Sequence, residues 1–107
     1  MTEAITVTDA TDASRFEIHV DGALAGFAEY RLRDQGRTVA VTHTEIDDAY
    51  AGRGLAKQLA VGVLEDLRAG GRALLPYCPF FSGYVRKHPE HLDLVPAERR
   101  AEFDLEG

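Results

Sequence analysis

The sequence predicts a domain of the α/β or α+β class, with a mixed but mostly antiparallel sheet, a central amphipathic helix and a second helix towards the carboxyl end. Three observations support this prediction. Apolar and β-branched residues alternate through most of the first 46 residues, the apolar period changes to about 3.6 after Gly54, and a short apolar stretch then precedes a second helical pattern. The 107 residues, 45% of them hydrophobic, suffice for a single domain over 1–107.

The first part of the chain is expected to form an antiparallel meander. The first ten or so residues are interpreted as either a short strand or a loose leader. From Arg15 apolar and polar residues alternate in a strand, and Asp21-Gly22 is typical of a hairpin turn before a second strand over 23–32. After a turn, β-branched residues predict a third strand over 38–46.

Two helices are predicted after this meander. The first has a branched apolar residue at every fourth position, at Leu55, Leu59, Val63 and Leu67. Gly70 and Gly71 are suited to a left-handed cap at its end. A short apolar strand over 72–76 and a second helix over 79–88 follow.

Composition excludes several classes of protein. A formal net charge of −6 argues against a nucleic-acid-binding protein, whose affinity depends mostly on Lys and Arg. No stretch approaches the roughly 18 uninterrupted apolar residues of a membrane span, and no signal peptide is expected. We therefore expect a cytoplasmic monomer or weak homodimer. One cysteine and scattered histidines argue against disulfides and against a metal site.

A glycine turn at residues 50–57 is the most informative segment. Gly52 and Gly54 allow close approach of a ligand and dihedrals barred to other residues. The first N–H groups of the next helix have no intrahelical partner, and the helix dipole adds positive potential, so the turn is suited to bind a phosphate. Lys57 stands where a dinucleotide motif needs a glycine, and no P-loop motif is present. A purely structural turn is the alternative interpretation.

Cys78 is the second distinctive feature. Pro79 suits the first position of a helix, which places Cys78 at the N-cap. Positive potential at a helix amino end favours the reactive thiolate form of a cysteine. The alternative interpretation is a small, inert, half-buried residue.

Four segments occur in a characteristic order: His-Thr-Glu-Ile at 43–46, Gly-Arg-Gly-Leu-Ala-Lys at 52–57, Pro-Tyr-Cys-Pro-Phe at 76–80 and Tyr-Val-Arg-Lys-His-Pro-Glu at 84–90. In order and spacing they resemble the small single-domain branch of the GCN5-related N-acetyltransferases, over residues 15 to 95 or so. The resemblance implies a mixed sheet that splays apart at its fourth strand and binds acetyl-coenzyme A.

The resemblance also implies how the cofactor is held. Its pyrophosphate would bind the backbone of the turn, where Ala51 replaces the usual Gln or Arg, and its pantetheine arm would align with the strand that ends at Ile46. Tyr84, Arg86 and Lys87 would line its thiol end or contact its phosphates. The cofactor-binding residues expected in this way are Ile46, Gly52, Arg53, Gly54, Leu55, Ala56, Lys57, Tyr84 and Lys87.

Acetyl transfer requires a neutral amine, a polarised thioester carbonyl and a proton for the leaving thiolate. His43 or Glu45, which share a face of the third predicted strand, are candidates for the base. A backbone N–H near Ile46 is the candidate for polarising the carbonyl, and Tyr84 for protonating the sulfur. Cys78 offers a second route, in which its thiolate receives the acetyl group first, whereas direct transfer is the usual route of the family. A hydrogen-bonded strand histidine is the alternative for His43.

We therefore expect an acetyl-coenzyme A-dependent N-acetyltransferase acting on an unidentified amine, on a small molecule or on a protein lysine or N-terminus. The small size, with no region for gripping the acceptor, keeps a coenzyme A-binding module with little or no catalysis as the alternative. An acidic interaction domain without a cofactor is a third interpretation.

Overall fold

The computed structural model describes residues 4–105. In chain order its strands and α-helices are β1 (Ile5–Ala10), β2 (Arg15–Val20), β3 (Ala23–Arg33), β4 (Thr38–Ile46), α1 (Leu55–Ala69), β5 (Ala73–Pro76) and α2 (Pro79–Lys87). A short 3-10 segment, η3 (Asp48–Tyr50), follows β4, and two more, η4 (Pro89–Leu94) and η5 (Ala97–Phe103), follow α2. Neither α-helix within residues 4–105 combines the length and apolar character needed to cross a membrane.

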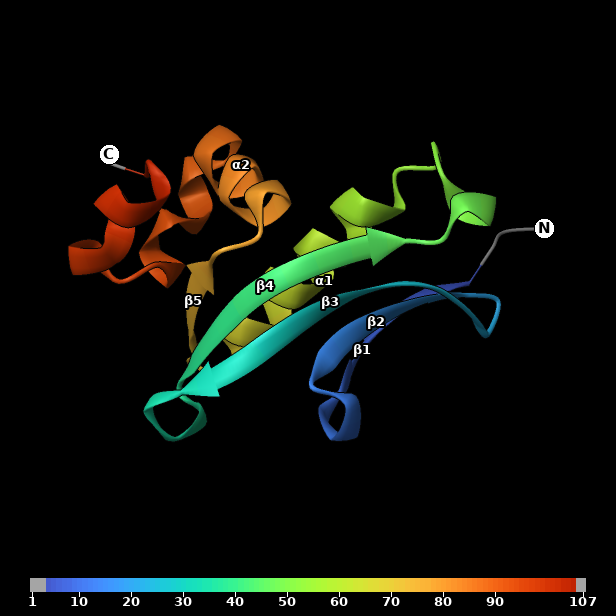
Figure 1. Cartoon of the computed structure of the whole chain (residues 1–107), viewed down its shortest axis with the longest axis horizontal. Helices are drawn as coiled ribbons and strands as arrows, with labels where there is room; N and C mark the ends of the chain where they lie inside the picture. The colour runs from blue at the N-terminus through green and yellow to red at the C-terminus, as the bar shows by residue number, and fades with distance from the viewer. Residues whose placement is uncertain (1–3, 106–107) are drawn as a thin grey trace.

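The strands form one five-stranded sheet in the order β1-β2-β3-β4-β5. The first four pair antiparallel, and β5 pairs parallel with β4 after the chain has crossed over through α1. Figure 1 shows α1 along one face of the sheet, while α2 and the carboxyl-terminal 3-10 segments gather at the β5 end. The predicted α+β class, with a mixed and mostly antiparallel sheet, is confirmed.

For the first ten or so residues the sequence allowed either a strand or a loose leader. In the structure, Ile5–Ala10 form a strand. β1 pairs with β2 from Ile5 opposite Val20 to Ala10 opposite Arg15. The meander therefore has four antiparallel strands, the three predicted from residue 15 onwards and β1. At the Asp21-Gly22 turn both residues have positive φ, 51° and 86°, which matches the hairpin that this pair predicts.

The core lies between the sheet and α1. All four predicted positions of the helical stripe are buried, and Ala60 and Leu64 widen it. α1 approaches β1 so closely that a Cβ added at Gly62 would lie only 2.7 Å from Cβ of Val7. At the end of the helix only Gly71 is left-handed, with φ of 66°, while Gly70 keeps right-handed helical dihedrals.

The carboxyl-terminal segment closes the β5 end of the core. α2 ends at Lys87, one residue before the predicted end, and Cys78 is its N-cap as predicted. Phe103 and Leu105 are buried, so the core extends past residue 95. The guanidinium of Arg86 donates to the carbonyls of Phe103 and Asp104 at 2.9 and 3.1 Å, which ties this segment to α2.

Candidate functional site

The loop between β4 and α1 is anchored before it reaches the glycine turn. The amide of Asp47 donates to the carbonyl of Ala25 at 2.8 Å, and the Asp47 carboxylate accepts from the amide of Ala49 at 2.9 Å. Tyr50 packs against the core, and the guanidinium of Arg53 lies 5.4 Å from the centre of its ring. These contacts fix the direction in which the chain enters the turn.

The glycine turn itself presents an open row of backbone donors. Gly52 and Gly54 have φ of 78° and 72°, which other residues rarely adopt. A Cβ on either glycine would meet no atom within 4 Å, so this side of the turn is open. In the described part of the chain, the amides of Gly52, Gly54 and residues 55–57 donate no hydrogen bond. Unpaired donors at the positive end of a 15-residue helix suit an anion.

The sheet opens beside this turn. β5 pairs with β4 only from Thr38 to Val41, where Pro76 is the last partner. The amide of Cys78 then donates to the carbonyl of Val41 at 2.9 Å, and the chain turns away into α2. Residues 42–46 therefore continue beyond the end of β5.

A β-bulge brings His43 and Glu45 to the sheet face away from α1. Val41 pairs with Tyr30 but His43 pairs with Glu29, so Thr42 is the extra residue of the bulge. His43 Nε2 lies 3.5 Å from Glu45 Oε1, and the two side chains are 54% and 61% exposed. The structure therefore places the two predicted base candidates together, with their side chains more than half exposed to solvent.

The other candidates for catalysis lie in separate contacts. The Cys78 thiol donates to the hydroxyl of Thr44 at 3.2 Å, and alternation along β4 places Thr44 on the face opposite to His43. The ring of Tyr84 packs against the imidazole of His88, with centroids 4.2 Å apart. Within residues 4–105, no hydrogen bond, ion pair or ring contact joins Cys78 or Tyr84 to His43.

The cationic candidates are also separated. Lys57 is exposed and lines a groove between α1 and β1, which includes Gly54 and Val7. Lys87 is exposed in the last turn of α2. Arg86 binds backbone carbonyls of the carboxyl-terminal segment, a structural role that differs from the phosphate contact implied by the resemblance. Ile46, at the end of β4, packs partly against the core.

Two residues near these candidates were not predicted. Thr44 belongs to the quoted 43–46 segment, but its contact with Cys78 joins positions 34 apart and no local pattern indicates it. Asp47 was missed although an Asp directly before a turn is a common N-cap. Among the described residues, no group of three His, Cys, Asp or Glu side chains is placed to hold a metal ion.

Comparison with known proteins agrees with this geometry. The family model described as GCN5-related N-acetyl-transferase matches residues 15–94. Protein NATD1 from Gallus gallus is 41% identical over 66 residues, covering 52% of this chain and 56% of that protein. Protein NATD1 from Homo sapiens is 41% identical over 58 residues, covering 50% of this chain and 47% of that protein.

The chain thus spans about half the length of the curated relatives it matches. The family match is longer and extends from β2 to the end of η4, so it includes β2 to β5, the glycine turn and both α-helices. On this evidence the chain belongs to the GCN5-related N-acetyltransferase family.

Proposed function

We propose that this chain is an acetyl-coenzyme A-dependent N-acetyltransferase that acetylates a primary amine. The observation that carries the proposal is the open row of unpaired amides at Gly52, Gly54 and residues 55–57, beside the strand that carries His43 and Glu45. Membership of the family supports the same activity.

The residues of the turn suit a diphosphate group. The amides of Gly52, Gly54 and residues 55–57 have no acceptor among residues 4–105, and a Cβ on Gly52 or Gly54 would meet no atom within 4 Å. The first turn of α1 has no acidic residue, so no carboxylate there would repel an anion. Ala51 supplies no side-chain donor, which leaves recognition to the backbone.

The chemistry follows from the groups at the end of β4. Acetyl-coenzyme A, when bound, supplies the acetyl group as a thioester, so that a carbon–nitrogen bond forms, the carbon–sulfur bond breaks and a thiol is released. His43 can take the proton that the amine loses, and Glu45, 3.5 Å away, stabilises the imidazolium that results. The phenol of Tyr84 is the candidate O–H donor for the sulfur.

A coenzyme A-binding module with little or no catalysis is the second candidate. The observation that favours it is the exposure of the two candidate bases, since the side chains of His43 and Glu45 are each more than half exposed. In the described region their polar side-chain atoms make no contact except with each other. A weakly held base contributes less to catalysis than a positioned one.

The two candidates are separated by thiol release and acceptor acetylation with a panel of amines. We expect His43→Gln to lower kcat about a hundredfold, the lower end of what general bases contribute, and to leave the affinity for coenzyme A unchanged. His19→Gln is the matched control, because His19 also pairs with a strand glutamate, Glu17, at 3.6 Å. Binding of coenzyme A without turnover on any amine would favour the module.

A further inference from the structure

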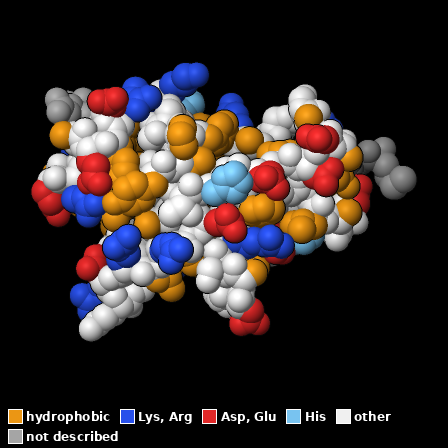
Figure 2. All heavy atoms as spheres, viewed as in Figure 1, with side chains coloured by type: hydrophobic (Ala, Val, Ile, Leu, Met, Phe, Trp, Pro, Cys, Tyr) orange, Lys and Arg blue, Asp and Glu red, His pale blue; other side chains and the backbone are white. Residues whose placement is uncertain are grey.

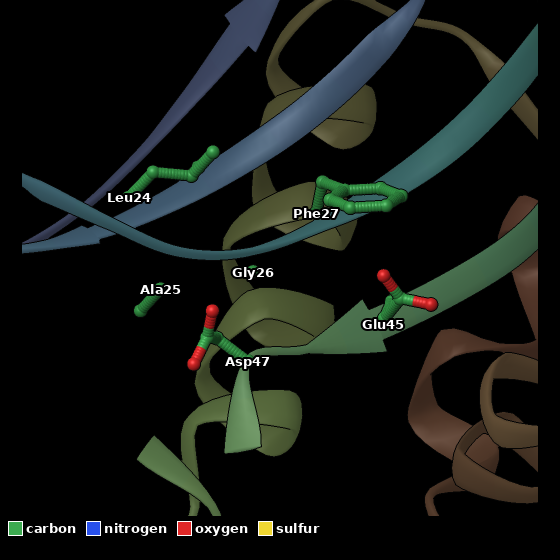
Figure 3. A pocket seen from close by; sticks show the side chains of 6 residues that line it. All are labelled: Leu24, Ala25, Gly26, Phe27, Glu45 and Asp47. Carbon is green, nitrogen blue, oxygen red and sulfur yellow. The ribbon is translucent and has the colours of Figure 1, made fainter. Parts of the chain in front are cut away.

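A shallow hollow lies beside the proposed base on the sheet face away from α1 (Figure 3). It has a volume of about 90 Å³ and is lined by Leu24, Ala25, Gly26, Phe27, Glu45 and Asp47. Pockets that enclose a whole small-molecule ligand usually measure roughly 300–1,000 Å³. This hollow is therefore sized for one side chain.

The two sides of the hollow differ in chemistry. Leu24 and Phe27 of β3 form an apolar side, and Leu24 is 43% exposed. The carboxylates of Glu45 and Asp47 stand on the other side (Figure 3). Such a pairing of apolar wall and anionic rim complements a side chain with a long aliphatic stem and a cationic end.

Part of each carboxylate is free to accept. Glu45 faces His43 through Oε1, and Asp47 accepts the amide of Ala49 through Oδ1. No hydrogen bond within residues 4–105 uses the second oxygen of either group. On the apolar side the guanidinium of Arg15 lies 4.5 Å from the Phe27 ring centre, and its charge is matched by Glu17 at 2.8 Å.

We propose that this hollow receives the side chain of a lysine carried by a polypeptide acceptor. The methylenes lie against Leu24 and Phe27, and the ammonium lies between Glu45 and Asp47. The proposal rests on the proposed function, because an amine held there is beside the His43–Glu45 pair that would take its proton.

The surroundings favour a polypeptide over a free amine. Figure 2 shows hydrophobic, acidic and histidine side chains together on the broad face over β3 and β4, where neighbouring residues of an acceptor segment can lie. The net charge of −6 attracts a basic segment.

The test uses a blocked peptide with one lysine and the same peptide with norleucine, which keeps the aliphatic stem and lacks the ammonium. Titration into the ¹⁵N-labelled full chain with coenzyme A present is expected to shift the amide resonances of residues 24–27, 45 and 47 with the lysine peptide, and much less with the norleucine peptide. Shifts centred elsewhere, or equal shifts with both peptides, would overturn the proposal.

Kinetics provide the second measurement. Asp47→Asn keeps the oxygen that caps Ala49 but removes the charge, so we expect KM for the lysine peptide to rise about three- to fivefold, with kcat nearly unchanged. Asp48→Asn is the matched control, since Asp48 is an exposed neighbour outside the hollow. An unchanged KM in Asp47→Asn would contradict the proposal.

The outcomes separate this proposal from the proposed function. Acetylation of free amines but not of the lysine peptide would overturn the lysine site and leave the acetyltransferase standing. If no amine is acetylated although coenzyme A binds, the acetyltransferase fails, and the titration with the two peptides still decides whether the hollow binds lysine.

Discussion

The thiol of Cys78 donates a hydrogen bond to the hydroxyl of Thr44, with 3.2 Å between sulfur and oxygen. This contact continues the link between β4 and the start of α2 that the Cys78 amide makes with the carbonyl of Val41. The cysteine is only 5% exposed, and Thr44 projects from the opposite face of β4 to His43. We therefore propose a structural role for this thiol, and with it direct transfer in place of an acetyl-cysteine route.

We predict that Cys78→Ala keeps kcat within about twofold and lowers the free energy of unfolding by about 1–2 kcal/mol, from the lost hydrogen bond and packing. Urea denaturation measures the stability, and thiol release measures the rate. Cys78→Ser, which can still donate to Thr44, is the control and should recover part of the loss. A covalent acetyl group on Cys78, seen by mass spectrometry with transfer abolished in Cys78→Ala, would contradict this prediction.

The buried contact between Tyr30 and Asp9 predicts a loss of stability in alkali. Burial, followed by the 2.6 Å hydrogen bond that the Tyr30 hydroxyl donates to Asp9, raises the pKa of Tyr30 from 10.0 to about 12. The folded state therefore holds this proton more tightly than the unfolded state. Its contribution, about 3 kcal/mol, is fully present below pH 10 and is lost as the pH rises from 10 to 12.

The measurement is chemical denaturation of the wild type and of Tyr30→Phe from pH 9 to 12. The phenylalanine variant lacks this proton, so the stability difference between the two proteins should shrink as the pH rises through this window. A difference that stays constant over the window would show that Tyr30 titrates alike in both states.

The close approach of α1 to β1 predicts that Gly62→Ala destabilises the fold. Cβ of an alanine would lie 2.7 Å from Cβ of Val7, an atom with no freedom to swing away. We expect overpacking of about 1–3 kcal/mol to exceed the roughly 1 kcal/mol that alanine gains over glycine in a helix. Denaturant unfolding of Gly62→Ala, Val7→Gly and the double variant should show that Val7→Gly, which removes the contacting Cβ, relieves part of the loss. A Gly62→Ala variant that is more stable than the wild type would refute the close contact.

Elements with a strong local pattern could be predicted from the sequence. The stripe from Leu55 to Leu67 and the run of β-branched residues over 38–46 match α1 and β4 in type and extent, because burial of one face imposes its period on the sequence. The carboxyl-terminal 3-10 segments could not be predicted, because the buried Phe103 and Leu105 follow no regular period. The carbonyls of Phe103 and Asp104 are held by Arg86, which belongs to another element.

At the site, the glycine turn and the His43–Glu45 pairing could be predicted from neighbouring residues. The bulge at Thr42 could not, because it depends on how β4 aligns with β3. Without it, His43 and Glu45 would continue the buried face of Val41 and point towards α1. The hollow between Leu24 and Asp47 was missed for the same reason, since it joins residues of β3 with Glu45 of β4 and with Asp47 of the loop that follows.

The central claim is that the amides of the glycine turn bind the diphosphate of coenzyme A, and isothermal titration calorimetry with coenzyme A tests it most directly. We predict saturable binding to one site, lost in Gly54→Asp, where a carboxylate would face the anion. Gly36→Asp is the matched control, because Gly36 has a similar positive φ of 86° and an equally open Cβ position away from the turn. Absence of binding heat at millimolar coenzyme A, or undiminished affinity in Gly54→Asp, would contradict the claim.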